Sequence, residues 1–120
     1  MKMNDENKIK DYSGLTGIEP AHRGKVRDIY DLDDKLLIVV SDRISAYDSV
    51  LPTPIPGKGI VLNLMSSRWF DFFEDVPNHK ISTEVERYPE KLRAFSGELA
   101  GRSMLVRKAE RIDLECIVSN

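Results

Sequence analysis

Residues 22–62 read HRGKVRDIYDLDDKLLIVVSDRISAYDSVLPTPIPGKGIVL, and this segment decides the fold of the chain. Residues 26–32 and 35–41 predict two strands, because Asp33 and Asp34 between them tolerate the geometry of a tight turn. The second strand, KLLIVVS, is apolar at consecutive positions. We therefore expect it in the centre of a sheet, with both of its faces covered.

A loop and a long helix follow this hairpin. Three prolines hold residues 42–59 extended and exclude a helix there. Beyond Gly59, apolar residues at i, i+3 and i+4 predict one amphipathic helix that ends before Pro77. We expect the apolar face of this helix to lie in the core. That face consists of Val61, Leu62, Met65, Trp69, Phe72 and Phe73.

The last third of the chain mixes short helices and strands. Thr83 and Glu86 have capping-box spacing, and a second short helix is expected over residues 89–95, with Gly97 as its terminator. Two further strands are expected at residues 103–109 and 114–118. The element order predicts a single α+β lobe, with an antiparallel, β-rich sheet and one main amphipathic helix.

Composition limits the class of protein. The 120 residues suffice for one domain or lobe, and 41% hydrophobic content supports a packed core. A net charge of −2 argues against nucleic-acid binding, and no apolar run is long enough to span a membrane. The amino terminus lacks the apolar stretch of a secretory signal. The single cysteine, Cys116, excludes an internal disulfide and predicts a cytoplasmic protein in which this thiol is buried and inert.

A Gly-Lys-x-Arg turn opens the first strand of the hairpin. Gly24 lets the backbone approach a ligand, and Lys25 and Arg27 alternate with Val26, so that both cations share one face. This pattern suits the phosphate tail of a nucleotide. Ordinary surface cations on a solvated strand edge remain the alternative from spacing alone.

Two further groups of polar residues follow the buried strand. In DRISAYD, residues 42–48, Ser45 and Asp48 can hydrogen-bond a substrate, although an ordinary Asx or Ser turn explains the same pattern. The sequence Gly57-Lys58-Gly59 precedes the helix and is not a P-loop, because the motif's earlier glycine and its following Ser or Thr are missing. It can still favour an anion at the start of the helix.

No catalytic triad or metal site is predicted. His22 and His79 are far apart in sequence, and neither lies in a cluster of ligands with metal-binding spacing. We interpret both as structural or surface histidines.

The serial order of these motifs is more specific than any one of them. The segments RGKVRDIYD, LLIVVSDRISAYDSVLPTPIPGKGIVLN, NHKIS and GRSMLVRKAERIDLECIV resemble the SAICAR synthase (phosphoribosylaminoimidazole-succinocarboxamide synthase) family from about Leu15 onward. The resemblance implies an N-terminal lobe, residues 1–120, that is similar to the small lobe of protein kinases and to ATP-grasp-like enzymes. In that family the nucleotide lies between two lobes.

The resemblance also implies roles for individual residues. The loop over the ATP phosphates comprises Gly24, Lys25 and Arg27. The hinge beside the adenine corresponds to Val106, Arg107, Lys108 and Ile112. The substrate-facing positions are Ser45, Asp48, Lys58, Gly59 and Glu115.

The family reaction joins L-aspartate to the carboxylate of the aminoimidazole ribonucleotide CAIR, using ATP and Mg²⁺. It needs no protein nucleophile, in agreement with the absence of a triad motif. The resemblance places the magnesium ligands in a C-terminal lobe that this sequence lacks, so the chain alone is expected to be inactive and to self-associate through the exposed face of its lobe. The alternatives are a non-catalytic nucleotide-binding or regulatory module and an interaction domain that binds no nucleotide.

Overall fold

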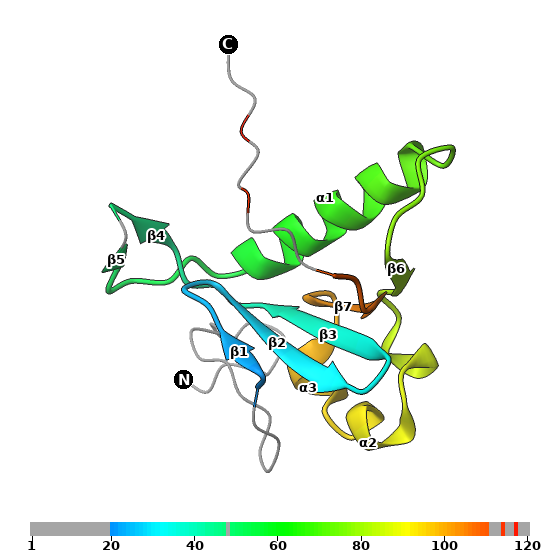
Figure 1. The fold of residues 1–120 in the computed structure, drawn as a ribbon. Coiled ribbons are helices and arrows are strands. Elements are labelled where there is room, and N and C mark those ends of the chain that lie inside the picture. Colours follow the sequence, from blue (N-terminus) through cyan, green and yellow to red (C-terminus); the bar gives the residue numbers. More distant parts are fainter. Residues whose placement is uncertain (1–19, 48, 111–113, 115–116, 118–120) are drawn as a thin grey trace.

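The computed structural model describes residues 20–47, 49–110, 114 and 117. Its elements form a five-stranded antiparallel sheet with helices on both faces and a separate two-stranded sheet (Figure 1). In chain order they are β1 His22–Arg23, β2 Arg27–Leu32, β3 Lys35–Val40, β4 Ser45–Ala46, β5 Ser49–Val50, α1 Lys58–Phe72, β6 Lys80–Ser82, η2 Val85–Arg87, α2 Glu90–Arg93, α3 Ser96–Leu99 and β7 Ser103–Arg107. The predicted α+β class, with an antiparallel sheet and one main helix, is confirmed.

The five-stranded sheet has the order β1-β2-β3-β7-β6, and every neighbouring pair is antiparallel. The predicted hairpin is present, with Asp33 in the left-handed region at φ 71°. Strand β3 is the middle strand of the sheet, as its continuous apolar sequence predicted. Strands β1 and β6 were not predicted, because two or three residues are too few to show an alternating pattern.

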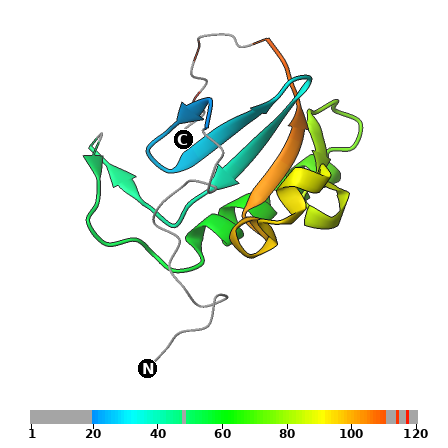
Figure 2. The ribbon, with the colours of Figure 1, turned by 90° about the horizontal axis from the view of Figure 1, so that it is seen from below.

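The hydrophobic core lies on the face of the sheet that η2, α2 and α3 cover. It combines sheet residues Tyr30, Leu37, Val39 and Leu105 with Val85, Tyr88, Leu92 and Leu99 from the covering segment. Figure 2 shows these short helices beside β7 in the view from below. The core is therefore built without any residue of α1.

Helix α1 lies on the opposite face of the sheet (Figure 1), and the face it turns toward the strands was predicted wrongly. Its buried residues are Gly59, Asn63 and Ser67, and not the residues of the predicted apolar face. The amide of Asn63 donates to the carbonyl oxygens of Gly101 and Ser103 at 2.9 and 3.0 Å. Small and hydrogen-bonding residues allow this close approach to the backbone, whereas Trp69 and Phe72, 55% and 71% exposed, point away from the sheet.

Two smaller expectations also fail. Gly97 lies inside α3 instead of terminating a helix, because α2 already ends at Arg93 and the chain turns again at Phe95. The capping-box spacing of Thr83 is not used, since Glu84 is the N-cap of η2 and no side chain caps it. The predicted strand at residues 114–118 and Cys116 lie outside the described residues.

A small hairpin, β4 with β5, extends from the sheet at the end of β3 (Figures 1 and 2). It occupies part of the loop predicted for residues 42–59. Among the helices of the described ranges, none combines the length and apolar character needed to cross a bilayer.

Candidate functional site

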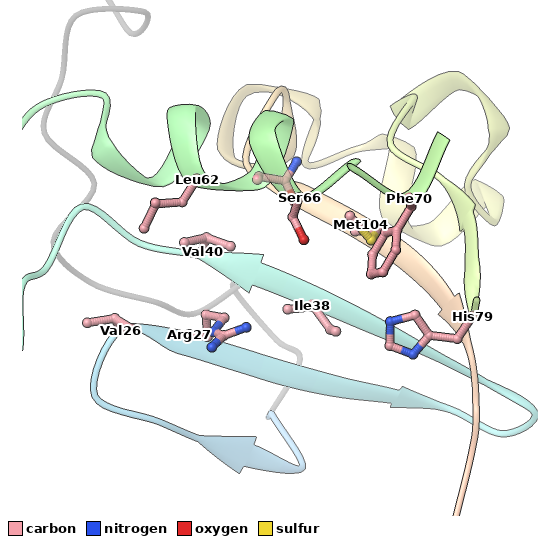
Figure 3. Close-up of a pocket in the computed structure, with 10 residues that line it drawn as sticks. Val26, Arg27, Ile38, Val40, Leu62, Ser66, Phe70, His79 and Met104 are labelled. Atoms are coloured by element: carbon pink, nitrogen blue, oxygen red, sulfur yellow. The ribbon is translucent and has the colours of Figure 1, made fainter. Parts of the chain in front are cut away.

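A cavity of about 350 Å³ lies between the sheet and α1 (Figure 3). Its apolar walls come from Val26, just before β2, and from β3, β7 and α1, and four polar side chains interrupt them. The apolar residues are Val26, Ile38, Val40, Leu62, Phe70 and Met104; the polar ones are Arg27, Asn63, Ser66 and His79. A mostly apolar cavity of this size with a few polar groups is typical of a small-molecule site.

The Gly24 turn forms one border of this cavity. The Gly24 N–H donates to the Arg27 carbonyl oxygen at 2.7 Å, and a Cβ on Gly24 would lie only 2.8 Å from that oxygen. The tight turn therefore requires glycine at this position. It delivers Val26 and Arg27 to the cavity, where Figure 3 shows both side chains beside the sheet. Lys25 is exposed on the same turn.

Cations gather where α1 begins. Burial lowers the pKa of Lys58, the nearby Asp42 carboxylate opposes that shift, and the positive charges of Arg27 and Arg43 add to it. Arg27 and Arg43 are thus each close enough to Lys58 to repel its positive charge. Their combined positive potential would stabilise a ligand with several negative charges at this end of the cavity.

A buried ion pair fixes the start of α1. Asp42 accepts hydrogen bonds from the Gly59 N–H at 2.9 Å and from Arg102 Nη1 at 3.0 Å. Arg102 Nη1 also donates to the Val40 carbonyl oxygen at 3.1 Å. A Cβ on Gly59 would collide with the carbonyl oxygens of Val40 and Ser41. Gly59 therefore has a packing reason to be glycine, independent of any ligand.

A second polar network joins the Gly24 turn to the end of β3. Ser41 Oγ donates to the Val26 carbonyl oxygen at 2.9 Å and accepts from Arg43 Nε at 2.9 Å. Arg43 Nη2 lies 3.6 Å from Asp28 Oδ1, and Arg23 Nε lies 3.8 Å from Asp28 Oδ2. Asp28 is fully buried and accepts no hydrogen bond from any residue that the structure describes. Its charge is offset by the two guanidinium groups at longer range.

The predicted hinge lies at the end of β7. Val106 is buried and pairs with Leu36, whereas Arg107 and Lys108 are exposed. Lys108 Nζ lies 2.9 Å from Asp31 Oδ2, and its hydrogen bond is the main reason that the pKa of Asp31 is lowered. The Arg107 N–H donates to the His79 carbonyl oxygen at 2.8 Å.

The predicted residues are only partly brought together. Arg27 lines the cavity, Val106 neighbours Met104 on β7, and Lys58 and Gly59 begin α1. Ser45 is exposed in β4, which belongs to the hairpin that extends from the sheet. Three further predicted site residues, Asp48, Ile112 and Glu115, lie outside the described residues.

Several residues at the site were missed by sequence reasoning. His79 lines the cavity, and its ring meets Phe70 edge-on at 5.7 Å. It was interpreted as an ordinary histidine, because no local pattern links it to the hairpin. The only sequence feature that could have identified Asp42 and Arg102 is that each is a charged residue near the end of an apolar strand.

No group of three or more potential metal-binding His, Cys, Asp or Glu side chains occurs within the described parts of the chain. The two buried carboxylates near the site, Asp28 and Asp42, face arginines instead.

Comparison with known proteins gives a consistent result. The family model described as SAICAR synthetase matches residues 20–120. Phosphoribosylaminoimidazole-succinocarboxamide synthase of Desulfosudis oleivorans is 52% identical over 108 residues, covering 89% of this chain and 37% of that protein. The protein of the same name in Syntrophotalea carbinolica is 58% identical over 98 residues, covering 81% of this chain and 33% of that protein.

Solved structures agree with the sequence comparison. A structure titled SAICAR synthase superimposes with a TM-score of 0.73 at 40% identity, over 84% of this chain and 37% of that one. A SAICAR-synthase from Saccharomyces cerevisiae, complexed with SAICAR, gives a TM-score of 0.71 at 41% identity over 81% of this chain and 36% of that one. The chain thus spans about a third of the length of the relatives it matches.

Proposed function

Because the chain belongs to the SAICAR synthetase family, we propose that it forms the N-terminal, nucleotide-binding lobe of a ligase of purine biosynthesis. The whole enzyme would join the amino group of L-aspartate to the carboxylate of CAIR, and convert ATP to ADP and phosphate. The observation that carries this proposal is the cavity between the sheet and α1, which the Gly24 turn borders and Arg27 lines, with Lys58 near Arg27 at the start of the helix.

The residues present fit ATP. A volume of about 350 Å³ lies within the range of small-molecule sites, and walls such as Ile38 and Met104 suit a flat purine ring. Lys25 and Arg27 on the Gly24 turn would hold the phosphates, together with Lys58, whose positive charge lies close to that of Arg27. Positive charges from two separate elements thus support a ligand that carries several negative charges.

The hinge would bind the base through its backbone. The N–H groups of Arg107 and Lys108 already donate to the carbonyl oxygens of His79 and Asp34. We therefore assign base recognition to main-chain groups that follow Lys108, in the segment that includes Ile112. Val106 would contribute a buried apolar wall, and the Lys108 side chain would stay on Asp31.

The substrate side of the site is a proposal by family resemblance. Lys58 and Gly59 would lie near the carboxylate or phosphate of CAIR, because Lys58 supplies a cation at the first turn of α1. We also assign Ser45, Asp48 and Glu115 to the substrates. Ser45 belongs to the exposed β4 hairpin, so it would reach the substrates from outside the cavity.

Magnesium does not fit the carboxylates that the structure describes in this lobe. Oxygen-rich ligand sets are what Mg²⁺ prefers, and no such cluster occurs among the described residues. Asp42 is hydrogen-bonded to Arg102, and Asp28 faces Arg23 and Arg43. We place the magnesium ligands in the rest of the enzyme.

The chemical task of this lobe is positioning and charge neutralisation. A phosphoryl transfer followed by attack of an amine needs aligned reactants and stabilised negative charge more than it needs a protein nucleophile. Arg27 and Lys58 would neutralise phosphate charge, and the Asp42–Arg102 pair would keep α1 fixed against β3 while they do so.

The test is to express the longer polypeptide that contains this sequence and assay it with CAIR, L-aspartate and ATP. We expect stoichiometric formation of SAICAR and ADP. ADP formation only with another acceptor, without a succinocarboxamide product, would overturn the proposed reaction.

The alternative is a nucleotide-binding module without catalysis, because a mostly apolar cavity lined by a cation, Arg27, can bind a nucleotide without catalysing a reaction. If the natural gene product stops at Asn120 and binds ATP without turnover, that alternative replaces the ligase.

A further inference from the structure

The carboxylate of Asp28 is buried without a hydrogen bond. Asp28 is fully buried, and neither of its oxygens accepts a hydrogen bond from any residue that the structure describes. Arg43 Nη2 lies 3.6 Å from Oδ1 and Arg23 Nε lies 3.8 Å from Oδ2, so both contacts are ionic and too long for hydrogen bonds. A buried polar group in this state is costly and is an exception in folded proteins.

Stability does not explain the charge of Asp28. Uncharged residues of similar volume in place of a buried ion pair are often neutral or stabilising, provided that no other charge is left buried. Here the partners reach water, because the Arg23 side chain is 53% exposed and the Arg43 side chain 17%. The role of this carboxylate therefore lies in the segments that it holds together.

Asp28 lies where three segments meet. It belongs to β2 and directly follows Arg27, whose side chain lines the cavity. In the antiparallel register it lies opposite Arg23, which leads into the Gly24 turn. Arg43 lies between β3 and β4, where the small hairpin extends from the sheet (Figure 1). One carboxylate thus attracts both the turn at the border of the cavity and the start of the hairpin.

The root of the β4 hairpin, residues 42–44 and 51–55, is held on both sides of β3. Asp42 binds Arg102, directly before β7, whereas Arg43 binds Ser41 Oγ at 2.9 Å and faces Asp28 in β2. Because β3 lies between β2 and β7 in the sheet, these two neighbouring residues fix the chain to the strands on either side. The Asp28 carboxylate supplies the attraction on the β2 side.

Backbone hydrogen bonds close the root of the hairpin. The Leu51 N–H donates to the Ile44 carbonyl oxygen and the Ile55 N–H to that of Asp42, both at 2.9 Å. Beyond these bonds Ser45 begins β4. The direction in which Ser45 leaves the sheet is therefore set at the root, where the ionic contact to β2 is made.

We propose that Asp28 is a positioning residue, whose charge keeps the Gly24 turn and the β4 hairpin in a fixed relation. The inference rests on the proposed function, in which the turn holds the ATP phosphates and Ser45 meets the substrates. Asp28 itself touches neither ligand, because it shares the core face of β2 with Tyr30, whereas Arg27 lines the cavity. It acts through its two arginines.

The first test is Asp28→Asn in the longer polypeptide, assayed with CAIR, L-aspartate and ATP. The change removes the charge and keeps the volume. The turnover number kcat should fall roughly ten- to hundredfold, since a displacement of about 1 Å between aligned ligands costs on the order of a hundredfold in rate. The urea midpoint of unfolding should stay the same or rise. An unchanged kcat, with or without a lower midpoint, would overturn the proposal.

Asp34→Asn is the matched control. Asp34 lies in the turn after the same strand, its side chain is 80% exposed, and it pairs with Lys35 on the surface. Its kcat should stay within about twofold of the parent, because surface ion pairs contribute little. An equal loss of kcat in Asp28→Asn and Asp34→Asn would contradict a specific role of Asp28.

A double variant decides whether Asp28 acts through Arg43, also where a single change lowers the stability. Arg43→Gln removes the other charge of the contact and should lower kcat roughly tenfold or more. The variant with both changes should lose no more than the larger single loss, because both changes break the same contact. Losses that multiply would mean that the two residues act independently, and would overturn the proposal.

Hydrogen exchange tests the same link without any substrate. In Asp28→Asn the N–H groups of Leu51 and Ile55 should exchange roughly tenfold faster or more, whereas those of β7 should change only with the global stability. Unchanged exchange at the root relative to β7 would overturn the proposal. Faster exchange at the root in a polypeptide that forms no SAICAR would reject the proposed ligase reaction and still support the link from Asp28 to the hairpin.

Discussion

Arg102 Nη1 lies 3.0 Å from Asp42 Oδ1 in the interior of the protein, although 60 positions separate the two residues in the chain. Asp42 follows β3, Arg102 precedes β7, and the same carboxylate accepts the Gly59 N–H at the start of α1. One ion pair thus joins the two central strands to the helix that forms the other wall of the cavity.

The first prediction concerns that pair. Arg102→Ala leaves the Asp42 carboxylate buried without its guanidinium, and losing one partner of a buried pair typically costs about 3–5 kcal/mol. Urea unfolding should therefore show a loss of that order, or no folded state at all. Arg87→Ala is the control, because Arg87 pairs with Glu84 on the surface, and such pairs contribute about 0–1 kcal/mol. If both variants lose a similar free energy of unfolding, the buried pair stabilises the protein no more than a surface pair does.

The second prediction separates two glycines. Gly59→Ala should destabilise the protein by about 1–3 kcal/mol or more, because the new Cβ meets the carbonyl oxygens of Val40 and Ser41. Gly97→Ala places its Cβ in open space within α3 and should stabilise by about 0.4–1 kcal/mol. The midpoints of thermal unfolding should move in opposite directions. A neutral Gly59→Ala would show that α1 can shift away from β3 easily.

The third prediction tests the phosphate loop in the longer enzyme. Lys25→Ala and Arg27→Ala should each weaken the use of ATP by roughly ten- to hundredfold, since a charge-assisted contact contributes about 1.5–3 kcal/mol. The Michaelis constant for aspartate should change far less. Lys35→Ala is the control, a cation at the other end of the same hairpin that binds Asp34 at 3.2 Å. If the kinetic constants for ATP do not change, Lys25 and Arg27 are ordinary surface cations that do not bind the phosphates.

The fourth prediction is a dependence on high pH. Burial raises the pKa of Tyr88, although its hydrogen bond to Ser103 Oγ at 2.8 Å opposes that shift. The unfolded tyrosine ionises near pH 10 while the folded one stays neutral, so the stabilisation is complete below pH 10 and declines as the pH rises through the folded value.

Tyr88→Phe isolates this contribution. It should cost about 0.5–1.5 kcal/mol at neutral pH, from the lost hydrogen bond. The free energies of unfolding of the two proteins should then converge as the pH rises above 10. A constant difference up to the pH of alkaline unfolding would refute the assignment to Tyr88.

The comparison of sequence and structure shows where local patterns suffice. The hairpin was predictable because Asp33 and Asp34 mark its turn and β3 is apolar throughout, so neighbouring residues carry the information. The family, too, followed from the order of short motifs. Both depend on residues that are close in the sequence.

Long-range choices were not predictable. The periodicity of α1 shows that an apolar face exists but not what covers it, and the face toward the sheet is set by Gly59 and Asn63. The Asn63 amide binds carbonyl oxygens of residues about 40 positions away in the sequence, and Arg102 binds Asp42, which is 60 positions away. His79 enters the cavity because β6 pairs with β7. Such contacts follow from the assembled sheet and not from spacing.

The last prediction concerns catalysis by residues 1–120 alone. We expect no SAICAR formation above background and weaker ATP binding than in the longer enzyme. Two physical reasons support this: the described residues include no carboxylate cluster for Mg²⁺, and the phosphates would stay in water, where each cation contact is weak.

The measurement is a coupled assay for ADP, with titration calorimetry for ATP, on protein purified from a host strain that lacks its own SAICAR synthase. The longer polypeptide, purified in the same way, provides the positive control. Since this chain matches only about a third of its relatives, turnover by residues 1–120 would mean that the remaining two-thirds contribute no essential group. In that case the magnesium ligands would have to lie within this sequence, and our proposal that they lie in the rest of the enzyme would be wrong.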